Sequence, residues 1–397
     1  MTRSLPLQAV LSTAVGLGAL CASGGVAQAQ FKQTDLASDI SGLATVTDPN
    51  LVNTWGLTAI PGHSPFWINN MGSGASSLYS VTGRTDVAPL NLNSAPGTNF
   101  SVIPGGGVVS GPTGIVANSG TSFGIAGGPA FFIFSNLNGS ISAFNLSNVN
   151  GATHNAATVV VPASSASYTG LAITSTSNPT PMLYAANETT GAIDVFDGSF
   201  GHTTVPGGFV DTSLPSGLVP FNVEDIGGTV YVAYAPPGHT AQTMATAGMG
   251  AVATFSESGV FEKNLVTGGP LASPWGMALA PPGFPEFGGD LLVGNFSYVD
   301  GDVINAFNAT TGTFVGKIDI NPGAGNMPGG LWSLAFGGGG PSGDPLTLYF
   351  TDGINHEKDG LFGALTVPEP STWAMMLIGF GGLAMFAARR RRAALAI

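Results

Sequence analysis

Two adjacent acids, Glu224 and Asp225, lie close to an amide, Asn222, in an extended and otherwise largely apolar stretch of the chain. Carboxylate and amide oxygens are the hard ligands that Ca²⁺ and Mg²⁺ prefer. Burying two acids without a cation is costly. Asn222, Glu224 and Asp225 are therefore candidate metal ligands, with one acid able to act as a general base. The competing interpretation is that both acids are exposed at a wide, solvated opening of the fold.

Amides and carboxylates also recur at the ends of short apolar strands, as in FWINN and LYFTD. The recurring residues are Asn70, Asn136, Asn187, Asn295 and Asp352. Such oxygens could complete a metal site, but Asn or Asp in this position is first of all a turn former that caps its own backbone. The loop Asp300-Gly301-Asp302 lacks the further oxygens of a calcium loop, so we predict a solvated turn there.

Other catalytic chemistry has little support. The five histidines lie in loop-like segments without metal-ligand spacing: His63, His154, His202, His239 and His356. His356 with Glu357 could take part in acid/base chemistry, but a loop pair of this kind is usually solvated. No G-x-S-x-G elbow indicates a serine hydrolase, and the glycine runs 105–107 and 337–340 lack the lysine and helix of a phosphate-binding loop. We predict no catalytic residue.

Diverged repeats of about 55 residues supply the elements that must position these groups. Each unit opens on a strand with a small or apolar pair and continues with the strand that ends in an amide or acid. A glycine and an alternating strand follow. The opening pairs are Gly56-Leu57, Gly114-Ile115, Gly170-Leu171, Phe221-Asn222, Gly276-Met277 and Leu331-Trp332. Three landmarks in one order, repeated six times, predict six antiparallel sheet units.

An outer strand is expected after five of the units, within DVAPLNL, ATVVVP, GFVD, FEKNLV and FVGKIDI. The sixth unit runs out of sequence at residue 366, while residues 31–40 form an orphan strand at the N-terminus. We therefore predict an all-β, six-bladed β-propeller over residues 30–366, closed by pairing of the N-terminal strand with residues 360–365. The rival is a β-helix or open solenoid, whose repeats are usually far shorter. In a propeller the first strand of each blade lines the central channel.

Composition excludes one class of partner. Charged residues make up 8% of the chain, against a typical ~25%. Residues 30–366 carry five basic and 21 acidic side chains, which is a net charge of −16. Such a surface repels nucleic acid and anionic lipid, so a nucleic-acid-binding role is excluded.

Residues 1–29 have the parts of a secretory signal peptide. Arg3 gives a basic start, residues 9–20 are apolar, and Ala27-Gln28-Ala29 fits cleavage by signal peptidase before Gln30. The single cysteine, Cys21, lies inside this segment. A lipoprotein signal would want a small residue in place of Leu20. The mature chain is therefore expected to carry no thiol for catalysis, metal binding or disulfides.

The C-terminal stretch 367–397 joins a proline-containing motif, an apolar run and a basic cluster. Its marked residues are Val367, Pro368, Glu369, Pro370, Arg389, Arg390, Arg391 and Arg392. Residues 373–388 would form a transmembrane helix of roughly 24 Å, a little short of the ~30 Å hydrocarbon core, with the arginines cytoplasmic. This order of parts resembles the PEP-CTERM sorting tail, which implies recognition by an exosortase-type membrane protease. An ordinary membrane anchor is the alternative.

The order of landmarks within each repeat resembles that of NHL-type and SMP-30-like propellers. Residues 48–83 resemble the opening signature of an uncharacterised family of secreted bacterial propellers that often carry PEP-CTERM tails, and residues 273–281 echo it. These resemblances imply the fold and the location, and bring no established activity.

Three function classes stay open for a protein that is exported, transiently anchored in the membrane and then held at the surface or released. The favoured class is a non-catalytic binding or matrix protein associated with exopolysaccharide or biofilm. The second is a divalent-metal-dependent hydrolase or lactonase of the SMP-30-like type, with Ca²⁺ or Mg²⁺. The third is a protein-interaction platform. Exposed tryptophans would support sugar stacking, but we expect core packing for Trp55, Trp67, Trp275 and Trp332.

We expect the cell to cut the chain near residues 367–370, because the tail joins a protease-recognition motif to a span of marginal length. Mass spectrometry of the exported protein should find a C-terminus in this range. A mature form that still ends at Ile397 in a host with an active exosortase would contradict this and leave a plain membrane anchor.

Overall fold

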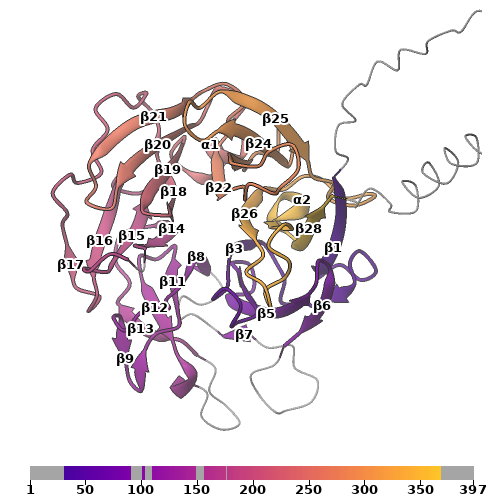
Figure 1. Ribbon diagram of the computed structural model, residues 1–397, viewed down its shortest axis with the longest axis horizontal. Helices are drawn as coiled ribbons and strands as arrows, with labels where there is room; N and C mark the ends of the chain where they lie inside the picture. The colour runs from indigo at the N-terminus through magenta and orange to yellow at the C-terminus, as the bar shows by residue number, and fades with distance from the viewer. Residues whose placement is uncertain (1–30, 91–100, 103–109, 149–155, 176, 368–397) are drawn as a thin grey trace, which may run out of the picture.

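The computed structural model describes residues 31–90, 101–102, 110–148, 156–175 and 177–367. Its six sheets of four or five strands stand like blades around one axis (Figure 1). In each blade the strands run from the axis outward and neighbouring blade strands are antiparallel. The six-bladed β-propeller that the repeats predict is confirmed.

The first three blades follow the chain in order. Blade 1 consists of β3 (Thr54–Thr58), β4 (Phe66–Asn70), β5 (Ala75–Thr82) and β6 (Asp86–Pro89), with β7 (Ser101–Val102) also paired to β5. Blade 2 consists of β8 (Pro112–Ala117), β11 (Phe132–Asn136), β12 (Ile141–Phe144) and β13 (Thr158–Val161). Blade 3 consists of β14 (Tyr168–Ile173), β15 (Met182–Asn187), β16 (Ala192–Asp197) and β17 (His202–Thr203). A small hairpin, β9 (Gly124–Ile125) and β10 (Gly128–Pro129), extends from blade 2.

The remaining blades repeat this order. Blade 4 consists of β18 (Val219–Ile226), β19 (Thr229–Ala235), β20 (Ala251–Ser256) and β21 (Phe261–Thr267). Blade 5 consists of β22 (Pro274–Leu279), β23 (Asp290–Asn295), β24 (Val303–Asn308) and β25 (Phe314–Asp319). Blade 6 consists of β26 (Leu331–Phe336), β27 (Leu348–Asp352), β28 (Leu361–Thr366) and, from the other end of the chain, β1 (Lys32–Ser38).

Closure of the ring by the N-terminal strand is confirmed. Strand β1 pairs antiparallel with β28, from Lys32 opposite Thr366 to Ser38 opposite Leu361, with one bulge between Asp35 and Ala37. A short strand that was not predicted, β2 (Val46–Thr47), runs parallel to the outer edge of β1. Pairing the first strand with the last removes the open edge that β28 would otherwise present.

Every inner strand carries a register shift near its start, where a bulge turns one side chain toward the axis. The residue after it is glycine in four blades, because the inner strands approach one another closely. A Cβ on Gly56 would lie 2.5 Å from the carbonyl oxygen of Thr113, and one on Gly276 would lie 2.0 Å from that of Trp332. These glycines therefore allow the blades to meet at the axis.

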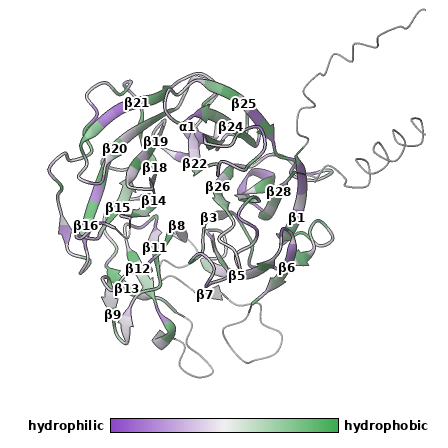
Figure 2. Cartoon of the chain, in the orientation of Figure 1, coloured by the Kyte–Doolittle hydropathy of each residue, from purple (hydrophilic) through white to green (hydrophobic). Residues whose placement is uncertain are grey.

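The outer strands are the least regular part of each blade. Four of the five predicted segments contain an outer strand, but GFVD does not: blade 3 ends in the two-residue β17 instead. Phe209 of that segment has a positive φ of 54° and is buried against Tyr184 and Phe255, so tertiary packing holds it as a loop. Figure 2 shows hydrophilic and hydrophobic residues together on the outer strands β21 and β25.

Helices are short and lie in the loops: η1 (Leu146–Asn148), α1 (His239–Thr243) and α2 (Ile354–Glu357). Within the described ranges none of them is long and apolar enough to cross a membrane. The predicted signal peptide (1–29), the predicted span (373–388) and the sorting residues after Val367 lie outside the described residues.

Candidate functional site

An aromatic plug closes one end of the central channel. It consists of side chains at the starts of the inner strands together with one from β23–β24: Trp55, Phe221, Trp275, Phe296 and Trp332. Trp55 stacks on Trp332 with ring centroids 3.6 Å apart, and Phe296 stacks on the same tryptophan at 4.2 Å. Trp55, Trp275, Trp332 and also Trp67 are at most 3% exposed. The prediction that these tryptophans pack in the core is confirmed.

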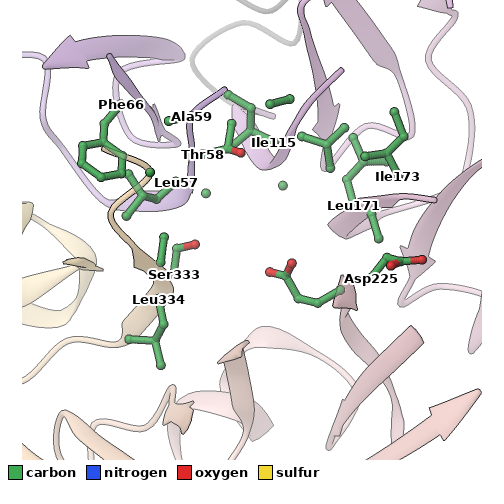
Figure 3. Close-up of a pocket in the computed structure, with 18 of the residues that line it drawn as sticks. Leu57, Thr58, Ala59, Phe66, Ile115, Leu171, Ile173, Asp225, Ser333 and Leu334 are labelled. Atoms are coloured by element: carbon green, nitrogen blue, oxygen red, sulfur yellow. The ribbon is translucent and has the colours of Figure 1, made fainter. Parts of the chain in front are cut away.

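A cavity of about 300 Å³ lies in the channel on the other side of the plug. Figure 3 shows Leu57, Ile115, Leu171 and Leu334 around it, each from a different blade. Trp275 of the plug, Asn222, Glu224 and Ser333 also line it. Most of the wall is apolar side chain or backbone, so its few polar side chains decide what the cavity can bind.

Three of those polar side chains stand where the blades depart from their own repeat; the others are Thr58, Ser119 and Asp225. In the strand registers, Asn222 and Ser333 take the place of the glycine found in the other four inner strands. Glu224 takes the place occupied by threonine, valine or alanine in the other blades. Asn222 donates from Nδ2 to the Trp275 carbonyl at 2.9 Å, and the same atom lies 3.5 Å from Glu224 Oε1. Blade 4 thus brings Asn222 and Glu224 together at the channel, as the sequence suggested.

The position of Glu224 in the ring favours the neutral form of its carboxyl group. Burial raises its pKa to about 8, and the charge of Asp225 adds to the rise, while the amide of Asn222 opposes it. The side chain keeps a partial exposure to the channel, although it lies deep within the ring, so loss of bulk water is the dominant effect. A protonated carboxyl both donates and accepts hydrogen bonds.

Asp225 is not part of the same cluster of oxygens, because successive strand residues point to opposite faces. Its Oδ1 accepts a hydrogen bond from the Gly228 N–H at 2.9 Å and so caps the turn between β18 and β19. Burial raises its pKa to about 6, and the nearby Glu257 carboxyl contributes. In Figure 3 Asp225 stands at the rim of the cavity.

Among the described residues no group of three or more His, Cys, Asp or Glu side chains could hold a metal ion. The recurrent asparagines serve their own blades: Asn187 Oδ1 accepts from the N–H groups of Thr189 and Thr190, and Asn295 Oδ1 accepts from Ala272 N–H. Capping of the local turn, one of the two interpretations of the recurrent set, fits Asn187, whereas Asn295 bonds a segment 23 residues earlier in the chain. A metal held by Asn222, Glu224 and Asp225 stays a prediction.

A second polar cluster, the His–Glu cluster, lies beyond the plug and consists of Asn53, His239, Tyr298 and Glu357. Glu357 accepts from Asn53 Nδ2 at 3.0 Å through Oε1, and from Tyr298 OH at 2.6 Å through Oε2. The ring Nε2 of His239 also contacts Oε2. Asn53 Oδ1 accepts from the Trp55 indole at 3.0 Å, which joins the cluster to the plug. Four blades therefore meet at one carboxylate.

The turn that carries Glu357 is strained. Asn355, His356 and Glu357 have φ values of 57°, 58° and 62°, a left-handed conformation that costs roughly 1–2 kcal/mol per residue. Asn355 offsets the cost with bonds from its side chain to Asn326 and Asp359. We expected the pair His356 and Glu357 to be solvated. This expectation is wrong for Glu357, because its side chain is only 7% exposed. His356 stacks on Tyr298 instead.

The His–Glu cluster can carry a proton. The hydrogen bond to Glu357 raises the pKa of His239 above its usual value, partly opposed by burial, with smaller contributions from the charges of Glu357 and Glu188. An exposed imidazole held by a nearly buried carboxylate is the arrangement of a general acid or base. Sequence reasoning missed this pair because 118 residues separate its members and neither position has a distinctive spacing.

Residues 366–392 match the PEP-CTERM protein-sorting motif. The chain therefore carries this motif on a β-propeller, and the motif implies processing by an exosortase-type system and a surface or extracellular location. Two uncharacterized proteins of Acanthamoeba polyphaga mimivirus are similar over most of their length. One is 29% identical over 363 residues, which are 85% of this chain and 86% of that protein. The other is 28% identical over 84% of this chain and 80% of its own length.

The fold is also found among solved structures. A structural genomics protein of unknown function from Bacteroides thetaiotaomicron superposes with a TM-score of 0.51 at 12% identity, covering 85% of this chain and 77% of that one. At this identity the likeness shows the fold alone.

Replacing Glu224 with glutamine should change how stability depends on pH. The folded protein keeps the Glu224 proton up to about pH 8, whereas the unfolded chain loses it near 4.5. The unfolded state therefore binds fewer protons between these values, and stability falls as pH rises, by up to about 1.4 kcal/mol per pH unit. Urea unfolding of Glu224→Gln at pH 5 to 8 should show a smaller fall than wild type. Asp225→Asn is the matched control, whose effect should end near pH 6. Parallel wild-type and Glu224→Gln curves would refute the assignment.

Replacing Glu357 with glutamine should lower the pKa of His239, because the carboxylate that stabilises the imidazolium is removed. NMR titration of the His239 ring protons measures this. Glu188→Gln, which removes a weaker and more distant charge, should lower the pKa by less. An equal effect of both variants would show that Glu357 does not hold the ring.

Proposed function

We propose that the propeller is a non-catalytic binding protein of the cell surface or extracellular matrix. Its channel cavity takes one end of a hydroxyl-rich ligand, such as a terminal residue of an exopolysaccharide. The observation that carries the proposal is the pair Asn222 and Glu224, the hydrogen-bonding side chains that blade 4 places in an inner ring of small and apolar residues.

The protonation of Glu224 favours an uncharged ligand with hydroxyl groups. Because its pKa is raised to about 8, the carboxyl is mostly neutral at pH 7 and offers one donor and one acceptor. Ser333, from the inner strand of blade 6, adds a hydroxyl to the same cavity. A sugar hydroxyl both donates and accepts, so it matches such groups better than an anion would.

The size of the cavity favours one small ring over an extended chain. A volume of about 300 Å³ is at the lower end of the range for small-molecule pockets. The aromatic plug closes the far end, so a polymer could enter only with its terminus. Binding of chain ends, repeated over many copies of the protein, would attach the propeller to a matrix without any chemical step.

Location supports the same conclusion. The sorting motif implies export and a surface or extracellular position, and the notable acidity of residues 30–366 keeps the propeller apart from anionic lipid. A neutral or amine-bearing polysaccharide is the polymer that such a surface would not repel.

A second candidate function is acid–base catalysis on the opposite face of the propeller. The observation that favours it is the exposed imidazole of His239, 61% accessible at its side chain and held by the buried Glu357. This arrangement could abstract a proton from a bound hydroxyl. It ranks second because binding at the channel cavity needs no further group, whereas catalysis needs a substrate site beside His239.

Saturation-transfer NMR with glucose, galactose, mannose, glucosamine and N-acetylglucosamine tests the binding proposal on the purified exported protein. At least one sugar should bind to wild type. Glu224→Leu should weaken binding roughly 5- to 150-fold, the effect of leaving a hydrogen-bonding group without its partner. Glu224→Gln keeps a donor and an acceptor and should retain most of the affinity.

Binding that survives Glu224→Leu unchanged would move the sugar site away from the cavity. No binding of any sugar to wild type would exclude a free monosaccharide as the minimal ligand and contradict the proposal in this form. A His239→Ala variant, which leaves the cavity intact, is the control for the opposite face.

A further inference from the structure

The second strand of each blade ends at an equivalent position in the ladder, where blade 4 has Tyr234 and blade 6 has an acid. Asn70, Asn136, Asn187 and Asn295 occupy this position in four blades. Each donates a hydrogen bond from its amide Nδ2, at 2.8 to 3.3 Å. Blade 6 has Asp352 instead. A carboxylate has no N–H group, so it cannot make the bond that the four asparagines make.

Blade 5 differs at the neighbouring position of the ladder, one residue beyond the partner of the strand-end residue, near the start of its third strand. The other five blades have glycine there: Gly74, Gly139, Gly191, Gly250 and Gly360. In blade 5 the residue is Asp302. Its Oδ1 accepts from the N–H groups of Gly330 at 3.2 Å and Gly329 at 3.4 Å. The expectation of a solvated turn is wrong for Asp302, because its side chain is directed inward.

These two exceptional acids meet between blades 5 and 6. Asp352 is 0% exposed and Asp302 is 2% exposed. The two carboxyl groups lie within hydrogen-bond reach of each other, and the charge of Asp35 on β1 also acts on Asp352. Burial, followed by the charge of Asp302, raises the pKa of Asp352 well above its usual range. Burial raises that of Asp302 to about 6.

Three buried oxygens of this pair have no hydrogen-bond donor: both oxygens of Asp352, and Oδ2 of Asp302. Neither carboxylate has an ion-pair partner among the described lysines, arginines and histidines. A single shared proton would satisfy one oxygen of Asp352 and Oδ2 of Asp302, and would leave the second oxygen of Asp352 buried and unpartnered. A cation between the two carboxyl groups would balance both charges, which a single proton does not do, so it accounts for the arrangement better than a proton does.

We propose that Asp302 and Asp352 hold a hard divalent cation, Ca²⁺ or Mg²⁺, which links blade 5 to blade 6. Oxygen-only coordination selects this class of ion, and waters would complete its shell, as is usual for Mg²⁺ with one or two carboxylates. The site is distinct from the channel cavity and from the proposed sugar binding. Asp302 lies two residues from the exposed Asp300, so the proposed site is close to the surface along the chain.

Calorimetric titration of the purified exported protein with CaCl₂ and with MgCl₂, after treatment with EDTA, tests the proposal. One site should appear, with a Kd on the order of 10⁻⁴ M, the range of extracellular calcium modules. At a 100-fold excess over Kd, the melting temperature should rise by about 3 to 6 °C.

The other blades provide the variants. Asp352→Asn restores the amide of four blades, and Asp302→Gly restores the glycine of five, so both changes are compatible with the fold. Asp352→Asn, alone or with Asp302→Gly, should reduce ion affinity at least tenfold and remove the ion-dependent rise in melting temperature. Asp300→Asn, in the same loop but exposed, should leave both unchanged.

Two results would overturn the proposal. If Asp352→Asn binds the ion as wild type does, while Glu224→Gln with Asp225→Asn loses it, the ion belongs to the channel. If wild type binds neither ion, the proposal is wrong; a higher melting temperature of Asp352→Asn than of wild type in EDTA would then indicate that the two acids share a proton.

Discussion

Six inner strands must pass within contact of one another around a single axis, and the rest of the molecule follows from that crowding. An added Cβ on four of these strands would meet a neighbouring blade at 2.0 to 2.5 Å, so only glycine fits there. The bulge at the same height turns the large rings inward, where they seal the channel. Blades 4 and 6 have Asn222 and Ser333 at that position in place of glycine. The side chains that can form hydrogen bonds in the channel therefore include those at the two positions where the repeat departs from glycine.

Much of the architecture could be predicted because it depends on local sequence patterns that recur in each blade. The alternating strands and the glycines between them are visible in short windows of sequence, and they located the blades. The missing fourth strand of the last unit predicted the ring closure. The predicted outer strand within GFVD was wrong because long-range packing determines that segment. Its residue types are typical of a β-strand, but Phe209 packs against Tyr184 and Phe255 in a left-handed conformation. No local pattern reveals these contacts.

The candidate sites divide in the same way. Asn222 and Glu224 could be singled out because acids are rare on a strand of this kind, although the raised pKa of Glu224 needed the burial to be known. His239 and Glu357 meet only through the ring, so their types and spacing carry no signal. Asp302 and Asp352 are intermediate: both were visible, but their significance appears only when the strand ladders align each blade with the others.

The pairing of the first strand with the last has a consequence for the order of events during secretion. A bond from Thr366 to Lys32 joins residues 334 positions apart, so β1 emerges first from a translocation channel and has no partner until almost all of the propeller has followed. Contacts between such distant residues form late and slowly. Until they pair, β1 and β28 each lack the hydrogen-bonding partner that they have in the finished fold. Closure of the ring is therefore expected to be the last step of folding, after almost the whole propeller has been exported.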